Sequence, residues 1–316
     1  MIAVVGEALV DLVVDALEPG DGDDADSGAL RGPRVSASLG GAPFNVARTC
    51  GRLGADVAFV GAVSDDRFGG AIMARLGGDG VELGAVERVA APTTLAVAEL
   101  SSHGGARYRF YVDGTSAPAL VGARPPRGTT VLVTGGLALA LQPMAGAVRG
   151  AVVDQPAGVL VVVDVNCRPA VITDRDAYVE RLDAVLERAD VVKLSDEDSA
   201  YLWPDDEPAE AAASVLRRGP RAVLLTAGAA GVSVVTARGA TRVAAPVVDV
   251  IDTIGAGDAF TGAFVAWWAR HGGPHDLDDI DALTSAATAA NTVAAVVCTR
   301  RGADPPWRHE LAGAGW

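Results

Sequence analysis

Cysteine, aromatic residues and lysine are all scarce in this sequence. The three cysteines, Cys50, Cys167 and Cys298, are far apart and odd in number, which excludes a disulfide framework and a C-x-x-C metal pair. Aromatic residues make up only 5 % of the chain, so the core must be built from Ala, Val and Leu. Lysine occurs once, at Lys193, and no Gly-Lys-Ser/Thr string exists, which excludes a Walker A loop.

Excess positive charge and long apolar runs are also missing. The formal net charge is -14, so the chain has no basic footprint of the kind that binds nucleic acid. Glu7 and Asp11 interrupt the apolar N-terminal run, which therefore predicts a strand and not a signal peptide. No uninterrupted apolar run reaches membrane length. We expect a soluble, cytoplasmic protein that binds neither nucleic acid nor a membrane.

Short β-branched runs alternate with Ala-rich helical runs along most of the chain. The runs that predict strands are residues 1–6, 57–62, 130–134, 159–165, 191–194 and 222–226. The runs that predict helices are residues 43–53, 67–76, 176–188, 208–217, 255–270 and 281–297. Continuous apolar strands are typical of sheets that are buried on both faces. The pattern therefore predicts an α/β layered domain with a largely parallel sheet, and 316 residues suffice for one large core with a small appendage.

Four further apolar runs are not separated by helices in this way. They are residues 9–14, 35–39, 93–101 and 106–112. We expect antiparallel strands that form a small β lid from residues 9–39 and 91–114, on a main domain made of residues 1–8, 40–90 and 115–316. The acidic, Gly-rich residues 18–33 predict a solvated hairpin tip, with an interaction tail as the alternative, because a run of Asp and Gly cannot bury itself.

The strongest chemical motif is D-T-I-G-A-G-D-A-F at residues 252–260, which opens a predicted helix. Gly255 and Gly257 leave room for a ligand, and the free N–H groups at a helix start form an anion site, which suits a transferring phosphoryl group. Asp258 lies in the first turn, where its carboxylate can accept the proton of an attacking hydroxyl. The alternative is a Gly-rich turn in which Asp258 only stabilises the helix. The helix dipole is expected to lower the pKa of Asp258.

This motif resembles the C-terminal signature of the ribokinase/PfkB-like carbohydrate kinases. The other signature of that family, a Gly-Gly turn that leads into a helix with an Asn, is present as G-G-A-P-F-N at residues 40–45. The resemblance covers nearly the whole chain and implies a ribokinase-like three-layer α/β/α domain with a mainly parallel central sheet and a β lid. It implies ATP-dependent phosphotransfer to a sugar hydroxyl, with Asp258 as the general base. The residues that it places beside Asp258 in catalysis are Gly255, Ala256 and Gly257.

The resemblance also implies a sugar site. Its residues are Asp11, Gly40, Gly41, Asn45 and Arg168. Arg168 belongs to D-V-N-C-R-P at residues 164–169, which is similar to an element of the fructokinase branch. Arg168 could stabilise phosphate charge, and the alternative is a structural ion pair with Asp164.

A nucleotide site is implied in the same way. Its residues are Lys193, Ser195, Thr226, Gly228, Gly231 and Asn291. The string K-L-S-D-E-D at residues 193–198 resembles the family element near the phosphates and Mg²⁺, with Asp198 where the family has Glu. The expected cofactors are ATP and Mg²⁺, with Asp198 in the magnesium environment. The resemblance further implies a monovalent cation such as K⁺, held by Asp252 and by backbone carbonyls near Ile254, Val297, Arg300 and Gly302.

The substrate that these elements favour is a neutral sugar, with fructose first, because G-E-A-L-V-D at residues 6–11 and the 164–169 element look more like fructokinases than ribokinases. The first alternative is 2-keto-3-deoxygluconate, whose carboxylate Arg107, Arg109 or Arg168 could bind. Another sugar or nucleoside kinase of the same fold and a non-catalytic sugar sensor are further alternatives. An exposed lid edge also favours a homodimer.

Overall fold

The computed structural model describes residues 1–15, 34–100, 106–273, 276–311 and 316. The predicted hairpin tip at residues 18–33 lies outside the described residues. Most of the remaining chain is folded into alternating strands and helices, as the sequence predicts.

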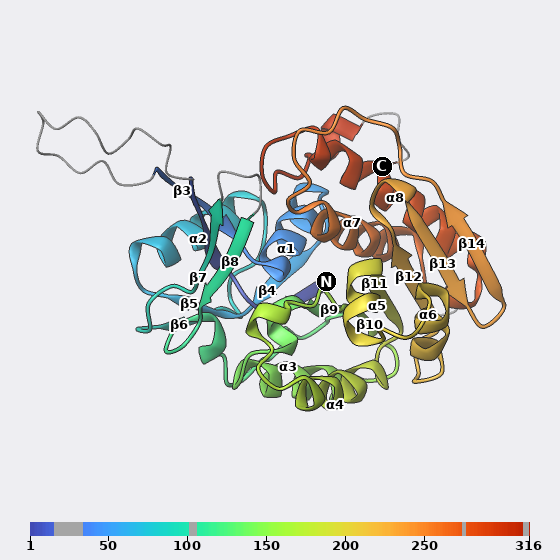
Figure 1. The fold of residues 1–316 in the computed structure, drawn as a ribbon, viewed down its shortest axis with the longest axis horizontal. Helices are drawn as coiled ribbons and strands as arrows, with labels where there is room; N and C mark the ends of the chain where they lie inside the picture. The colour runs from blue at the N-terminus through green and yellow to red at the C-terminus, as the bar shows by residue number, and fades with distance from the viewer. Residues whose placement is uncertain (16–33, 101–105, 274–275, 312–315) are drawn as a thin grey trace, which may run out of the picture.

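An eight-stranded sheet forms the centre of the molecule (Figure 1). In spatial order its strands are β14 (Gly239–Val243), β13 (Val232–Thr236), β12 (Ala222–Thr226), β11 (Val191–Ser195), β10 (Leu160–Asp164), β9 (Val131–Gly135), β1 (Ile2–Val5) and β4 (Val57–Val60). The strands from β12 to β4 are parallel, and β13 and β14 add an antiparallel edge. The prediction of a mainly parallel sheet is confirmed.

Helices cover both faces of this sheet. The helices are α1 (Ala42–Arg52), α2 (Arg67–Gly78), α3 (Met144–Val153), α4 (Arg175–Leu186), α5 (Asp196–Leu202), α6 (Pro208–Leu216), α7 (Ala256–His271) and α8 (Ile280–Cys298). Because successive side chains of a strand point to opposite faces, Ile2 and Val4 of β1 belong to one core, which also contains residues of α1, α2, α7 and α8. Ala3 and Val5 belong to a second core on the other face, which also contains residues of α3, α4, α5 and α6. The two cores confirm the three-layer α/β/α fold.

A second, four-stranded sheet lies to one side of the central sheet (Figure 1). Its strands, in spatial order, are β3 (Val35–Gly40), β2 (Leu9–Val14), β7 (Leu95–Leu100) and β8 (Ala106–Tyr111). The outer pairs are antiparallel as expected, but β2 and β7 are parallel, so the expectation of antiparallel strands is wrong for the central pair. A long connection that contains α1, α2, β5 (Ala62–Ser64) and β6 (Glu87–Val89) joins β2 and β3 to β7, and such a connection permits parallel pairing. The division into a main domain and a lid stays a prediction.

Helix α8 is long and apolar enough to cross a membrane, and it alone passes that test in the described part of the chain. It packs against α7, β13 and β14, and 50 % of its apolar window is buried. We therefore interpret α8 as a core helix of the α/β domain.

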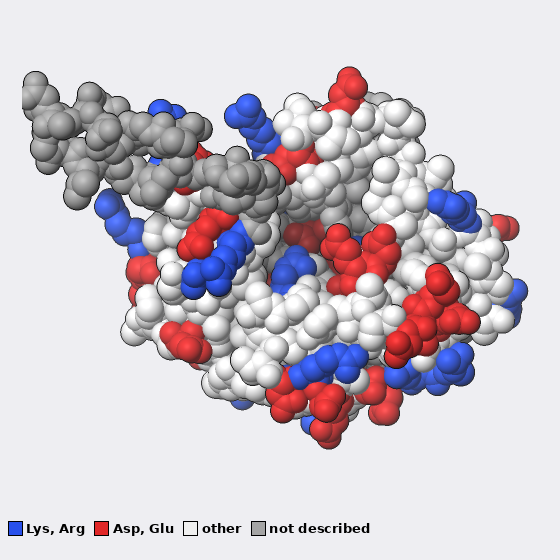
Figure 2. Space-filling view, in the orientation of Figure 1, with Lys and Arg blue, Asp and Glu red and all other residues white. Residues whose placement is uncertain are grey.

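The carboxyl ends of the parallel strands meet at one edge of the central sheet, where ligand sites of α/β proteins gather. Figure 2 shows a hollow at the centre of one face, lined by both acidic and basic side chains. Four of the sequence motifs, at residues 6–11, 164–169, 193–198 and 226–231, lie at the ends of β1, β10, β11 and β12. The motif at residues 40–45 follows β3, and that at residues 252–260 opens α7.

Candidate active site

The N-terminus of α7 forms the centre of the candidate site. Gly255 caps this helix with φ 77°, a left-handed conformation that favours glycine, and a Cβ added to it would overlap the Cβ of Ala303. The Ala256 N–H donates within the preceding turn at 3.2 Å. The N–H groups of Gly257 and Asp258 have no partner among the residues that the structure describes, so two backbone donors remain for an anion.

Asp258 is half-buried beside these donors and is held by two amides. Asn45 Nδ2 donates to Asp258 Oδ2 at 2.8 Å, and Asn166 Nδ2 donates more weakly to Oδ1 at 3.4 Å. Burial is the main cause that raises the pKa of Asp258 to about 6; the hydrogen bond from Asn45 opposes the rise, and the charge of Asp164 adds to it. The net shift is therefore upward and not downward as expected from the helix dipole, because burial disfavours the charged carboxylate. A raised pKa makes the carboxylate a better base.

Lys193 lies directly under the α7 turn. A Cβ added to Gly257 would lie 3.5 Å from Lys193 Nζ. This buried ammonium donates to Asp164 Oδ1 at 2.8 Å, and Thr261 Oγ1 of α7 donates to Asp164 Oδ2 at 2.7 Å. Burial alone would lower the pKa of Lys193, but neighbouring carboxylates, chiefly Asp164, outweigh burial and raise it. The ammonium therefore stays charged close to the anion-binding turn.

The residues predicted to contact the sugar gather on the lid side of the same site. Asp11 lies against Gly40, where an added Cβ would overlap the Asp11 carboxylate. Gly41 caps α1 with φ 107°, so the Gly-Gly turn requires glycine at this position. Burial raises the pKa of Asp11 to about 6, and the positive charge of the exposed Arg168 opposes this rise. Arg168 Nη1 donates to the Cys167 carbonyl at 3.0 Å. The ion pair with Asp164, which was the alternative role for Arg168, is formed by Lys193.

The loop at residues 226–231 and Asn291 both contact the segment at the end of β14. A Cβ added to Gly231, which has φ 88°, would overlap the carbonyl oxygen of Val243. Asn291 Nδ2 on α8 donates to the carbonyls of Val243 and Ala244 at 3.4 and 3.3 Å. Gly231 and Asn291, two of the nucleotide-site candidates, therefore contact the same segment at residues 243–244.

Asp198 is committed to protein contacts. Its Oδ2 accepts hydrogen bonds from the backbone N–H and the hydroxyl of Ser195 at 3.0 and 2.7 Å. The first of these bonds and the bond from the Asp198 N–H to Ser195 Oγ at 3.0 Å form the capping box of α5. Its Oδ1 accepts the Cys167 N–H at 2.6 Å. Among the described residues, no group of three or more His, Cys, Asp or Glu side chains could hold a metal ion. The magnesium role of Asp198 stays a prediction.

The residues predicted to hold a monovalent cation come from two adjoining segments. Asp252 Oδ1 accepts the Ile254 N–H at 3.0 Å, and Oδ2 accepts the Gly302 N–H at 2.8 Å. The segment is tied to the end of α8 by a hydrogen bond from Ile251 N to the Cys298 carbonyl at 2.8 Å. Asp252 therefore adjoins both segments that carry the predicted carbonyl ligands, and oxygen donors suit a hard cation.

Sequence reasoning missed the role of Glu7, a buried residue between β1 and β2. Its carboxylate accepts backbone N–H groups of Ala42, Leu137 and Ala138 at 3.3, 3.3 and 3.1 Å. Burial raises the pKa of Glu7 to about 7, although backbone hydrogen bonds, including those from Leu137 and Ala42, oppose the rise. The sequence signal that could have indicated this role is the position of Glu7, a charged residue directly after an apolar strand. Asn166, with φ 41°, was also missed as a partner of Asp258.

The profile of the pfkB family of carbohydrate kinases matches residues 1–310. The chain therefore belongs to the pfkB family carbohydrate kinases, which confirms the resemblance, and it is a sugar kinase. A fructokinase from Klebsiella pneumoniae is 32 % identical over 311 residues, which cover 96 % of this chain and 94 % of the relative.

Solved structures agree with this assignment. The fructokinase from Xylella fastidiosa with bound ATP is 27 % identical with a TM-score of 0.81, and the match covers 96 % of this chain and 93 % of that chain. The aminoimidazole riboside kinase from Salmonella enterica, complexed with aminoimidazole riboside and an ATP analogue, is 25 % identical with a TM-score of 0.83. That match covers 100 % of this chain and 99 % of the other.

Proposed function

We propose that this sugar kinase is an ATP-dependent fructokinase with Asp258 as the general base. The observation that carries the proposal is the position of the Asp258 carboxylate. It lies beside the N–H groups of Gly257 and Asp258, which have no partner among the described residues, and it accepts a hydrogen bond from Asn45. Relatives that are fructokinases, and one solved fructokinase with bound ATP, support the choice of substrates.

In the proposed reaction, a sugar hydroxyl gives its proton to Asp258 Oδ1. This oxygen is the better acceptor, because Asn45 occupies Oδ2 at 2.8 Å and Asn166 contacts Oδ1 only at 3.4 Å. The hydroxyl oxygen forms a bond to the γ-phosphorus of ATP while the bond to the β,γ-bridging oxygen breaks, and ADP leaves. The N–H groups at the start of α7 and the ammonium of Lys193 stabilise the charge on the transferring group.

Mg²⁺ would neutralise the β- and γ-phosphates when bound with ATP. We propose that K⁺ lies at Asp252, with carbonyls of the segments that Asp252 joins as further ligands. The charge of the K⁺ ion would then lie close to the N-terminus of α7 and would add to the positive potential there. The cytoplasmic location and a homodimer that pairs through the lid sheet stay predictions.

The neutral sugar is favoured by the polar groups on the lid side. Asp11 and Asn45 offer carboxylate and amide groups, which suit hydroxyls. Arg168 favours the second candidate, 2-keto-3-deoxygluconate, because its charge acts on both Asp11 and Asp258 and is therefore near a bound sugar.

The test is a comparison of kcat/KM for fructose, tagatose, ribose, 2-keto-3-deoxygluconate and adenosine, with ATP and Mg²⁺ under one condition. Fructose is expected to be the best substrate, since sites that bind hydroxyls discriminate strongly against analogues that leave those groups unpaired. A competitor that exceeds fructose by about tenfold or more, or about 1.4 kcal/mol, would reject fructose and keep the kinase assignment. In that case Arg168→Gln would separate an acid sugar from a neutral one, because only an acid sugar loses its counter-charge.

A further inference from the structure

Helix α1 contacts two parts of the candidate site at once. Asn45 binds Asp258, and Arg48, on the next turn, donates from Nη1 to the Ala303 carbonyl at 2.8 Å. Ala303 lies directly against Gly255, since a Cβ added to Gly255 would overlap the Cβ of Ala303. One helix therefore holds both the reacting carboxylate and the residue that supports the anion-binding turn.

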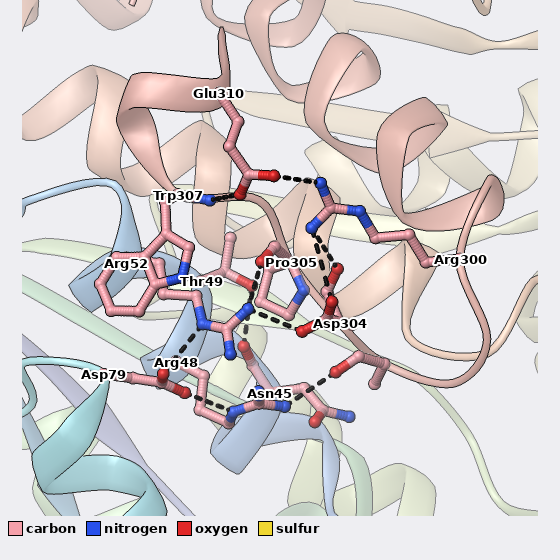
Figure 3. Close-up of polar contacts among 11 residues, drawn as sticks. Asn45, Arg48, Thr49, Arg52, Asp79, Arg300, Asp304, Pro305, Trp307 and Glu310 are labelled. Carbon is pink, nitrogen blue, oxygen red and sulfur yellow. Dashed lines mark hydrogen bonds and ion pairs between the residues drawn. The ribbon is translucent and has the colours of Figure 1, made fainter.

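Arg48 is itself held in one orientation. Its Nε donates to Asp79 Oδ2 at 2.7 Å, and Arg52 Nε donates to Asp79 Oδ1 at 2.9 Å (Figure 3). Arg48, Arg52 and Asp79 are only 5, 7 and 3 % exposed. The Arg48 guanidinium also lies 5.5 Å from the centre of the Phe44 ring. A planar guanidinium with these contacts has little freedom, so the position of its second N–H donor is fixed.

Arg52 holds the same segment a little further along. Its Nη1 donates to Asp304 Oδ1 at 2.7 Å and to the Pro305 carbonyl at 2.6 Å (Figure 3). At the other end of this segment, the Gly302 N–H donates to Asp252. Residues 302–305 are thus clamped between α1 and the turn that carries Asp252 and Gly255.

Stability alone is a weak explanation for these charges. Replacing a buried ion pair by well-packed apolar residues is often neutral or stabilising, because burial of charge is costly. An apolar residue at position 48 could fill the space, but it could not bind the Ala303 carbonyl. The guanidinium therefore supplies a defined position for the backbone under Gly255, which packing does not.

We propose that Arg48 is a positioning residue for phosphoryl transfer, which fixes Ala303 and, through its contact with Gly255, the position of the α7 turn relative to Asn45 and the sugar side of the proposed site. The inference rests on the proposed phosphotransfer, but not on which sugar is the substrate. Loss of this contact should displace the donors that act on the transferring group, while α1 and Asn45 stay packed on the sheet. The effect should fall on kcat and leave the KM for the sugar nearly unchanged.

The test variant is Arg48→Lys, which keeps the charge but cannot span both Asp79 and the Ala303 carbonyl with a fork of fixed geometry. It is assayed with the best sugar of the substrate panel, and kcat is normalised to the folded fraction. We expect kcat to fall by roughly 10–10²-fold, the size of effect that small misplacements produce.

The matched control is Arg188→Lys. Arg188 also donates to backbone carbonyls, those of Gln155, Pro156 and Val159, but at the opposite edge of the sheet. We expect a similar loss of Tm from the control and an unchanged kcat.

Ala303→Gly tests the same link with the buried charges intact, because it removes only the Cβ that lies against Gly255. If Arg48 acts through Ala303, the double variant loses less activity than the product of the two single losses, since contacting residues are not additive. Multiplicative losses, or a kcat for Arg48→Lys that matches the Arg188→Lys control, would overturn the inference and leave the proposed kinase reaction intact. A wild-type enzyme without activity on any sugar would overturn both.

Discussion

Asn45 and Asp258 are 213 positions apart in the chain, and their side chains are joined by a hydrogen bond of 2.8 Å. One residue belongs to the helix after the Gly-Gly turn, and the other to the helix after the second glycine motif. The bond orients the carboxylate and leaves Oδ1 toward the weaker Asn166 contact. The two sequence motifs therefore meet at one place, where the proposed reaction would bring the sugar and the phosphate together.

Asp258→Asn should lower kcat by roughly 10²–10⁴-fold, the usual contribution of a general base. The amide keeps an oxygen for Asn45, so the fold and the KM for the sugar should change little. Steady-state kinetics with saturating ATP provide the measurement. The exposed Asp176→Asn, on α4, is the control for removal of one negative charge. Near-wild-type kcat in Asp258→Asn would exclude this residue as the base.

The pH dependence of kcat should have an acid limb near pH 6. The pKa of Asp258 is raised to about 6, and only the ionised carboxylate accepts a proton, so kcat is retained above this pKa and falls as the pH drops through it. Asp11 also has a pKa of about 6, but it is not the proton acceptor in the proposed reaction. Asp11→Asn should therefore keep the acid limb of kcat while the KM for the sugar rises. Loss of the limb in Asp11→Asn would point to Asp11 instead.

Glycine substitutions should separate the α7 turn from ordinary helix positions. Gly255→Ala should strongly lower kcat and the Tm, because φ 77° disfavours alanine and the new methyl group would overlap Ala303. Gly70→Ala in α2 is the matched control, since nothing lies within 4 Å of its added Cβ. It should stabilise the protein by about 0.5–1 kcal/mol through helix propensity. Equal effects of the two substitutions on Tm and kcat would contradict the special role of Gly255.

Activity should rise with K⁺ more than with Na⁺ at constant ionic strength, if a cation lies at Asp252. Asp252→Asn removes the only carboxylate predicted to bind it and should increase the K⁺ concentration needed for half-maximal activity. Titration of kcat with KCl, balanced by a bulky organic cation salt, measures this. Identical rates in K⁺ and in the organic cation would refute the site.

The fold could be predicted because its signals are local. Alternation of β-branched and Ala-rich runs marks the parallel strands and their helices, and the glycine motifs mark the turns at the carboxyl edge of the sheet. The parallel pairing of β2 and β7 could not be predicted from alternation, because the strand pattern does not record which neighbour a strand takes.

The site was only partly predictable for a related reason. Gly255, Asp258 and Asn45 stand in recognisable strings, but the contact from Arg48 to Ala303 joins residues 255 positions apart. The direction of the Asp258 pKa shift depends chiefly on burial, which is not encoded in the motif. The pairing of Lys193 with Asp164 likewise needs the register of two neighbouring strands.

The burial of Lys193 has a practical consequence for chemistry on the intact enzyme. It is the only lysine, and its ammonium is enclosed and ion-paired, so it is a poor target for amine-reactive reagents in the native state. Acylation of Lys193 would therefore report that the native structure has opened, because the side chain must leave its ion pair with Asp164 before it can react.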